Sequence, residues 1–399
     1  MAALSIRWWA NPLSFPPSTS PRFRVIRTAA KALRFFACSL LSIGTIGCSQ
    51  EGRVAAAAYR LQSIRTLAVP DSIYDGELID ADLLGEIGIV FASGRGRGLS
   101  LLRWDGTFAE LARYGQGPCE LALADGLAVQ TDGKILVSDL KNRRVQLYNR
   151  ERCESEVPLP SLFISRMWRT TSGVRIHAQR ASRASILLLR GDAPASAPLA
   201  ELRFLGDPAH SICTYCWMTV APDGTIYSRV QADTVYRIAR FNPDGRPAGF
   251  IERSGVPIVR MSDEDRDSVE MFRRSLPARA PNEAARRSIE MALEAFPIFS
   301  YKFLFAGMPL VDAQNRLFIA RSSNMGKPVP VDVFDAPSGH FLGEVRLPAG
   351  AKLVRSTEQG ILVFRDDDAV GPSFNVYRLE RASPGIDNST RPPSAEPEK

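Results

Sequence analysis

Short stretches of alternating apolar and polar residues fill the middle of the chain, and the clearest of them covers residues 126–148. Alternation with a period of two is typical of strands that bury one face. Asp132 and Gly133 interrupt the alternation, and this pair supplies the positive φ angles that a tight hairpin requires. The stretch therefore predicts three antiparallel strands. Its alternating apolar residues are Val129, Ile135, Val137, Val145 and Leu147.

The same pattern of strand, tight turn and strand recurs along the chain. A second clear copy has Asp223 and Gly224 at its turn, and a third has Asn315, a residue type that tolerates the left-handed conformation. Three weaker copies complete a set of six units. The intervals between the turns are similar, except that the fourth interval is far longer than the others. The turn positions are Gly85, Gly133, Gly173, Gly224, Asn315 and Gly360.

An insertion at residues 257–298 accounts for the long interval. Ser262 followed by Asp265 is a capping-box pattern, and apolar residues then recur at helical spacing. Pro277 ends this helix, and Asn282 opens a second one with apolar residues along one side. We therefore expect a helical hairpin between the fourth and fifth units.

Each unit is a small twisted sheet that cannot bury both of its faces alone, so the units must stack around an axis or along a solenoid. Units of this length with three or four antiparallel strands favour an axis. We predict an all-β fold, a six-bladed β-propeller over residues 60–382 with a helical-hairpin insertion between blades four and five. Closure of such a ring usually needs a strand from the opposite end of the chain, and we expect residues 60–69 to supply the outer strand of the last blade.

One predicted blade, within residues 114–150, carries a more specific pattern. Its characteristic residues are Gly115, Gly117, Pro118, Glu120, Leu121, Asp132, Gly133, Val137, Asp139, Asn142, Arg144 and Val145. The pattern resembles an NHL repeat of the six-bladed, TolB-like propeller superfamily. Two other predicted blades match this repeat moderately, and three match it poorly. The resemblance implies that Asp139 and Asn142 organise the turn between strands and that Arg144 packs between blades or at the rim. The superfamily contains ligand sensors, interaction platforms and some metal-dependent hydrolases and lyases, so the fold does not select a function.

The beginning of the chain has the residue order of an export signal. Basic residues precede the uncharged run 35–47, which is shorter than the ~20 residues that a membrane-spanning helix needs. The segment 45–48 resembles a bacterial lipobox, in which small residues precede a cysteine that becomes acylated. We therefore expect Cys48 to carry a lipid that tethers the protein to a membrane.

These features predict how the chain is divided and where it resides. We expect an exported protein of the cell envelope, anchored by its lipid and facing the periplasm or the exterior. Ser49 rather than aspartate follows the lipidated cysteine, which by resemblance favours the outer membrane. The expected segments are a lipoprotein signal with a long n-region at 1–47, a flexible tether at 48–59, the propeller at 60–382 and a proline-rich disordered tail at 383–399.

Composition and charge argue against one class of function, nucleic-acid binding. Hydrophobic residues make up 45% of the chain and charged residues 23%, which is an ordinary globular composition. The formal net charge is +7, but residues 1–47 contain six basic residues and no acidic one. The remaining body is therefore almost neutral, and it lacks the basic surface that neutralises phosphates in nucleic-acid binding proteins. We expect no nucleic-acid partner.

Four cysteines of the expected mature body, Cys119, Cys153, Cys213 and Cys216, are candidates for disulfides, which export permits. Their pairing is open, and buried thiols or a zinc site made of all four remain alternatives. The three histidines, at 177, 210 and 340, do not have the spacing of metal ligands. We predict no catalytic residue, no metal site and no cofactor.

Two functions from different classes fit these observations. The first is a non-enzymatic binding module that presents its loops, and the helical insertion, to a protein, peptide or small ligand. The second is a metal-dependent hydrolase of the lactonase or esterase sort with its site at the central tunnel, which needs several converging oxygen ligands. The inner strands expected at 127–130 and 218–221 offer only apolar and hydroxyl groups. The hydrolase therefore ranks second.

Overall fold

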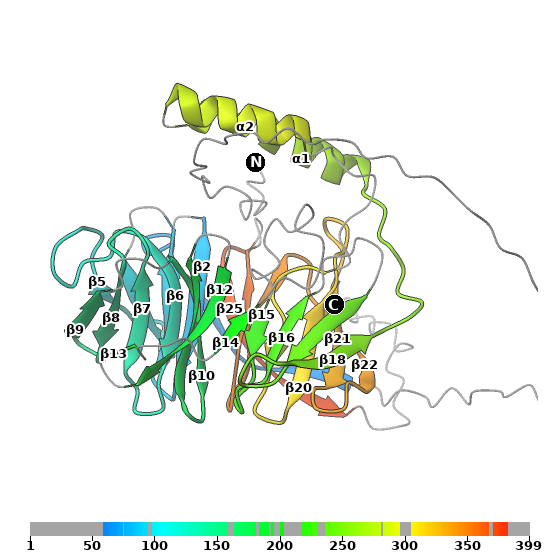
Figure 1. The fold of residues 1–399 in the computed structure, drawn as a ribbon, viewed down its shortest axis with the longest axis horizontal. Coiled ribbons are helices and arrows are strands. Elements are labelled where there is room, and N and C mark those ends of the chain that lie inside the picture. The colour runs from blue at the N-terminus through cyan, green and yellow to red at the C-terminus, as the bar shows by residue number, and fades with distance from the viewer. Residues whose placement is uncertain are drawn as a thin grey trace, which may run out of the picture.

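The computed structural model is an all-β propeller in which strands far outnumber helices (Figure 1). Its strands form six antiparallel sheets. Five of them are regular four-stranded blades, and one has five strands. The structure describes residues 59–74, 76–94, 98–158, 163–180, 183–190, 193–194, 200–202, 218–229, 236–280, 282–295, 305–366 and 370–381. The predicted signal, the lipidated cysteine, most of the tether and the tail lie outside these residues.

Four regular blades are each built from consecutive strands. The first contains β2 (Leu78–Leu84), β3 (Gly88–Ser93), β4 (Leu99–Arg103) and β5 (Phe108–Ala112). The second contains β6 (Ala124–Val129), β7 (Ile135–Asp139), β8 (Arg144–Tyr148) and β9 (Cys153–Pro158). Another contains β15 (Met218–Val220), β16 (Ile226–Arg229), β17 (Arg237–Phe241) and β18 (Pro247–Glu252). The last of the four contains β19 (Leu310–Val311), β20 (Arg316–Ala320), β21 (Val329–Asp335) and β22 (Phe341–Leu347).

The last blade joins the two ends of the described chain. Strands β23 (Ala351–Thr357), β24 (Gly360–Arg365) and β25 (Ser373–Arg381) are completed by the first strand, β1 (Tyr59–Ala68). β1 pairs antiparallel with β25 from Tyr59 opposite Arg381 to Ala68 opposite Ser373. The prediction that a segment near the start supplies the outer strand of the last blade is confirmed.

The remaining sheet departs from six equivalent blades. It contains β10 (Phe163–Thr170), β11 (Gly173–Arg180), β12 (Arg183–Arg190), β13 (Ala193–Pro194) and β14 (Ala200–Leu202). Both β13 and β14 pair with β12, at opposite ends of that strand. The prediction of a six-bladed propeller is thus corrected: the structure has five regular blades, and the remaining sheet has five strands.

The first strand of each sheet lies on the inside of the molecule. Neighbouring inner strands contact one another in the order β2, β6, β10, β15, β19 and β23, and β23 contacts β2 again. Each of the five hydrophobic clusters in the described residues fills the space between two neighbouring sheets. Full burial of a Phe or Leu side chain contributes about 1.5–3 kcal/mol, so these inter-sheet layers supply most of the stability.

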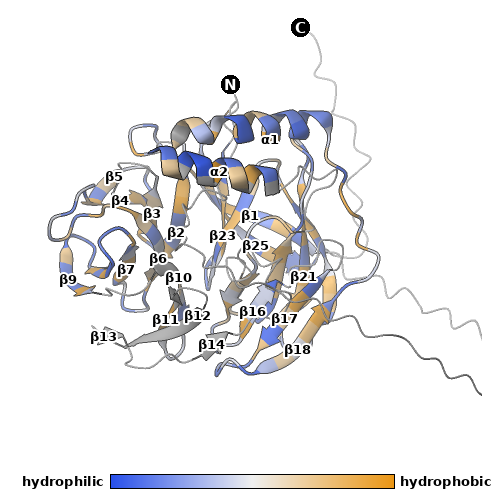
Figure 2. Cartoon of the chain, turned by 45° about the horizontal axis from the view of Figure 1, so that its top comes forward, coloured by the Kyte–Doolittle hydropathy of each residue, from blue (hydrophilic) through white to orange (hydrophobic). Residues whose placement is uncertain are grey.

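Two helices separate β18 from β19 in the chain. They are α1 (Asp263–Ser275) and α2 (Glu283–Ala295), with a short 3-10 turn (Pro277–Arg279) between them. The side chain of Ser262 accepts a hydrogen bond from the backbone N–H of Asp265, as the capping pattern predicted. The helices lie side by side above one face of the propeller (Figure 2), and Arg273 of α1 donates to the carbonyl of Leu293 in α2.

Candidate functional site: an ionic cluster between the inner strands

Four of the inner strands bend at a corresponding place. The pairing register shifts between Leu78 and Asp80 in β2, between Ala124 and Gly126 in β6, between Ile164 and Arg166 in β10, and between Leu353 and Arg355 in β23. Such β-bulges redirect side chains and are common beside functional sites. A charged residue occupies or directly follows each of the four bulges. We call these four residues, together with Asp82 of β2, the axial cluster. Its members are Asp80, Asp82, Asp125, Arg166 and Arg355.

Arg355 connects strands from four sheets. Its Nη2 donates to Oδ2 of Asp80 and to the carbonyl of Leu127, at 2.7 Å in each case, and its Nη1 donates to the carbonyl of Met167 at 2.7 Å. Its Nε lies 3.4 Å from the carbonyl of Ala81. Since β2 and β6 separate β23 from β10 in the ring, this side chain crosses the space that the inner strands enclose.

Asp80 and Asp82 are buried, and backbone donors satisfy them. Oδ2 of Asp80 accepts from the N–H of Leu127 at 3.1 Å, and Oδ2 of Asp82 accepts from the N–H of Val129 at 2.9 Å. These bonds link β2 to the edge of β6 that does not pair with β7. Burial raises the pKa of Asp82, against the lowering effect of Arg355. Burial would lower the pKa of Arg355, but Asp80 and Asp82 outweigh it and raise that pKa.

Asp125 differs from these two carboxylates. It is the extra residue of the β6 bulge, and protein largely encloses its side chain while leaving part of it open to solvent. Its carboxyl makes no hydrogen bond to any residue within the described ranges. Burial raises the pKa of Asp125 to about 7, and nearby Asp80 adds to the increase, while Arg166 opposes it. Asp125 therefore exchanges a proton near neutral pH.

Gly126 sets the distance between β6 and β10. A Cβ atom at this position would lie 3.0 Å from Cα of Arg166 and 3.4 Å from its backbone N and C atoms. The two inner strands can approach this closely only because residue 126 has no side chain. This close approach brings the carboxyl of Asp125 and the guanidinium of Arg166 into the same small region, where burial lowers the pKa of Arg166.

The residues of the NHL-like pattern lie on the second blade, away from the axial cluster. The carboxylate of Asp139 accepts from the backbone N–H and the Nδ2 of Asn142, at 3.3 and 2.6 Å, and from Nε of Arg144 at 3.3 Å. Arg144 also binds Glu156 at 2.8 Å and donates to the carbonyl of Gly117 at 2.8 Å. These contacts fasten the turn after β7 and the loop that precedes β6.

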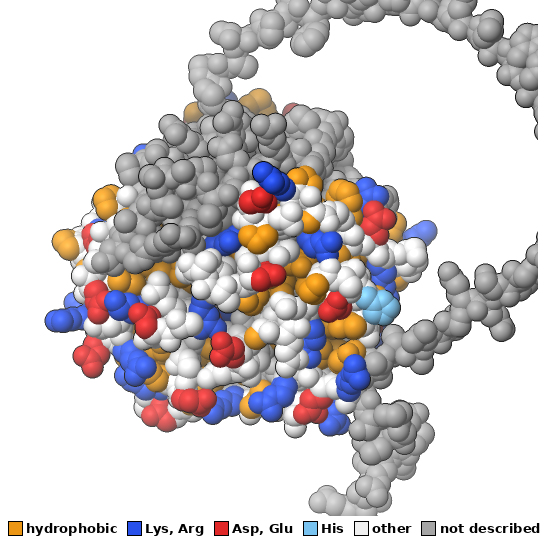
Figure 3. All heavy atoms as spheres, turned by 60° about the horizontal axis from the view of Figure 1, so that its bottom comes forward, with side chains coloured by type: hydrophobic (Ala, Val, Ile, Leu, Met, Phe, Trp, Pro, Cys, Tyr) orange, Lys and Arg blue, Asp and Glu red, His pale blue; other side chains and the backbone are white. Residues whose placement is uncertain are grey.

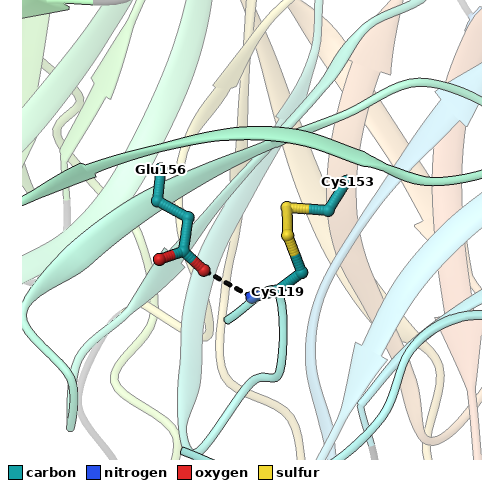
Figure 4. A group of neighbouring side chains, drawn as sticks. All are labelled: Cys119, Cys153 and Glu156. Carbon is teal, nitrogen blue, oxygen red and sulfur yellow. Dashed lines mark hydrogen bonds between the residues drawn. A yellow bond between two sulfur atoms is a disulfide. The ribbon is translucent and has the colours of Figure 1, made fainter. Parts of the chain in front are cut away.

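A disulfide fastens the same loop. Cys119 bonds to Cys153 of β9, a pairing that the sequence left open. Figure 4 shows Glu156 accepting a hydrogen bond from the backbone N–H of Cys119, and Tyr148 donates to the Cys119 carbonyl at 3.0 Å. Cys119 adopts a φ of +61°, which the bonds on both sides hold in place.

The other predicted turn residues form tight hairpins. Gly133 and Gly224 have φ angles of +82° and +91°, and the carboxylates of Asp132 and Asp223 accept from the backbone N–H two residues ahead. These four residues do not contact the axial cluster. Cys48, Cys213, Cys216 and His210 lie outside the described residues, as does the side chain of His177, and His340 is exposed.

The described residues offer a poor fit to a metal ion. Only one group of three possible ligand side chains comes together among them, and it consists of Cys119, Cys153 and Glu156. Two of these three are joined in the disulfide, so they cannot act as thiolate ligands. In the axial cluster, the guanidinium of Arg355 already neutralises Asp80.

Sequence reasoning missed the axial cluster. The expectation of only apolar and hydroxyl groups concerned residues 127–130 and 218–221, and it does not extend to the rest of the ring, because β2 carries Asp80 and Asp82 and β6 includes Asp125. A signal was present in β2, where two aspartates alternate with apolar residues in a strand that is otherwise hydrophobic. Arg355 and Arg166 gave no such signal, since only the closed ring brings their strands together.

The described surface carries charges of both signs. In Figure 3, basic and acidic side chains are interspersed over the face opposite the helices, with no large basic patch on its described part. In the chain segments that the structure covers, no helix is long and apolar enough to cross a membrane.

No family model and no curated protein matches this sequence. Several solved structures are similar in fold. An exported protein of Bacteroides fragilis is 12% identical, with a TM-score of 0.49, and the match covers 82% of this chain and 96% of that one. A gluconolactonase of Xanthomonas campestris is 13% identical with a TM-score of 0.42, and the match covers 80% of this chain and 96% of that one. A regucalcin of Agrobacterium tumefaciens is 15% identical with a TM-score of 0.44, and the match covers 79% of this chain and 94% of that one. Similarities at this level say nothing about the function of the chain.

Proposed function

We propose that this chain is an exported, membrane-tethered β-propeller that acts as a non-enzymatic binding module for a protein, peptide or small ligand. The arrangement of Arg355 is the observation that supports this best. Its guanidinium neutralises Asp80 and binds backbone carbonyls of Leu127 and Met167, so it fills the space between the inner strands. A metal-dependent hydrolase would need several free oxygen ligands at this place.

The proposal includes a ring of six blades of the NHL-type, TolB-like kind. The sheet of β10 to β14 serves as the sixth blade, its outer strand being split into β13 and β14. Two features support this assignment: β10 contacts both neighbouring inner strands, β6 and β15, and the chain enters and leaves this sheet in the same strand order as in the regular blades.

The proposal also places the protein in the cell envelope. Residues 1–47 act as the export signal, and a lipid on Cys48 holds the propeller at the outer membrane, facing the periplasm or the exterior. The sequence pattern supports this assignment, as does the short distance along the chain from Cys48 to the start of β1 at Tyr59. At about 3.3–3.6 Å per residue, such a tether keeps the propeller within roughly 40 Å of the membrane surface.

The face that carries the helices is the proposed binding face. Because α1 and α2 lie between outer strand β18 and inner strand β19, they are attached where the inner strands begin, and Asp125 lies at the start of β6. Met271 and Met291 on these helices are 71% and 63% exposed. Methionine adapts to varied partners, which suits a binding surface.

A metal-dependent lactonase or esterase remains the alternative. The observation in its favour is Asp125, a solvent-accessible carboxyl whose pKa of about 7 would suit a general base. The described residues assemble no metal-ligand group beside it, and Asp80 is engaged by Arg355. The binding module is therefore the better-supported function.

Two measurements on the mature, lipid-free chain test the choice. Pull-down from solubilised envelope should retain a partner, and deletion of residues 257–298 should weaken that retention. Metal analysis together with an ester and lactone panel should show neither stoichiometric metal nor turnover. Turnover that is lost in Asp125→Asn, or failure of both forms of the protein to retain any partner, would refute the proposal.

A further inference from the structure

The axial cluster contains more acidic groups than basic ones. Three carboxyls, those of Asp80, Asp82 and Asp125, face two guanidiniums, those of Arg166 and Arg355. If every group were charged, the cluster would carry one uncompensated negative charge in a region from which water is largely excluded. Such a charge is costly, and a proton relieves it. Burial raises the pKa of both Asp82 and Asp125 and so favours a proton on each carboxyl.

Of the three carboxyls, only Asp125 is open to a ligand. Asp80 and Asp82 are 2% and 5% exposed, and both accept hydrogen bonds from backbone N–H groups. Asp125 keeps part of its surface in contact with solvent and has no hydrogen-bond donor from the described residues. A largely enclosed carboxyl that lacks a protein donor is a natural acceptor for a donor brought by a ligand.

We propose that Asp125 binds the ammonium group of an amine ligand at the centre of the propeller. This inference rests on the proposed binding function and adds the chemical class of the ligand. An ammonium group supplies three N–H donors and one positive charge, which is the charge that the cluster lacks. A divalent metal fits less well, because Asp125 belongs to no group of three His, Cys, Asp or Glu ligands within the described residues.

The proposal requires a proton to leave when the amine binds. Among the described residues, the charged groups that act on Asp125 are Asp80 from β2 and Arg166 from β10, and Asp80 is in turn paired with Arg355 from β23. The group that titrates is the carboxyl of Asp125 itself. With a pKa of about 7, Asp125 is roughly one-tenth ionised at about pH 6 and nine-tenths ionised at about pH 8. The affinity for the amine should therefore rise about tenfold over this range.

Isothermal titration of the mature chain with n-butylammonium chloride tests the proposal, with sodium butyrate at equal ionic strength as the anionic counterpart. We expect saturable binding of butylammonium, tighter at about pH 8 than at about pH 6, with proton release detected by comparing two buffers of different ionisation enthalpy. Asp125→Asn should abolish this binding. Asp105→Asn, which changes an exposed aspartate in the turn after β4, is the matched control and should bind like the wild type.

Three results would overturn the inference: no saturable butylammonium binding in the wild type at about pH 8, equal binding by Asp125→Asn, or affinity that falls as the pH rises. If Asp125→Asn does not fold, as judged by circular dichroism, the pH dependence and proton release of the wild type decide alone. Failure of the amine titration with continued capture of an envelope partner would refute the ligand class and leave the binding function standing. Failure of both would refute the two together.

Discussion

Replacement of Arg355 by methionine removes the side chain that links four sheets. Methionine fills much of the same volume and cannot donate hydrogen bonds. Asp80 would then lie buried without its counter-ion, and the carbonyls of Leu127 and Met167 would lose their donor. The change therefore tests whether the axial cluster holds the inner strands together.

The expected loss is large for a single substitution. Removing one partner of a buried ion pair costs about 3–5 kcal/mol, and each buried carbonyl left without a donor adds to this. Arg355 and Asp80 are 9% and 1% exposed in their side chains, so solvent screens the pair little. We expect the free energy of unfolding to fall by about 5 kcal/mol.

Urea unfolding followed by circular dichroism measures this change. Arg346→Met is the matched control, because Arg346 pairs with Glu344 at 3.3 Å but its side chain is 73% exposed. Exposed pairs of this kind contribute at most about 1 kcal/mol. The double variant Arg355→Met with Asp80→Asn also removes the buried carboxylate that has lost its counter-ion. It should recover about 2 kcal/mol or more of the free energy of unfolding. A loss below about 1 kcal/mol in Arg355→Met, equal to that of the control, would refute the reasoning.

Three further predictions concern the disulfide, the pH dependence and the inner strands. Replacing Cys119 and Cys153, which are 34 residues apart, with serine should lower the free energy of unfolding by about 4 kcal/mol, as measured in urea. The pKa of Asp125 is about 7 in the folded state and ~3.9 in the unfolded state. Between these two pH values the folded state therefore binds more protons than the unfolded state, and the free energy of unfolding falls as the pH rises from about 4 to about 7. Asp125→Asn should remove this slope in urea unfolding at about pH 5 and about pH 7.5. Gly126→Ala should cost about 1–3 kcal/mol in thermal unfolding, because its Cβ would lie 3.0 Å from Cα of Arg166.

The blade pattern could be predicted because it is local in the sequence. Strand alternation and the turns at Gly133, Gly224 and Asn315 lie within a few residues of each other, and all three turn residues have the expected positive φ. The pairing of β1 with β25 could also be predicted, since a closed ring needs one strand from the far end of the chain. The pairing of both β13 and β14 with β12 was not predicted, because each segment is too short to show a pattern of alternation.

The axial cluster could not be predicted from local patterns. Arg355 meets Asp80 and Met167 across separations of 275 and 188 residues, and no spacing rule connects such positions. Bulges in the inner strands determine which side chains point inward, and a bulge changes the alternation on which sequence reasoning relies. Asp125 in particular lies directly before Gly126, where the sequence pattern suggested only the start of a strand.

A crystal structure of the mature chain grown in millimolar calcium tests most directly whether the centre of the propeller is a binding site or a metal-dependent active site. We predict that the guanidinium of Arg355 lies between Asp80 and the carbonyls of Leu127 and Met167, and that no ion is bound to the axial carboxylates. Electron density for a calcium ion coordinated by Asp80 or Asp125, with Arg355 displaced, would contradict the account.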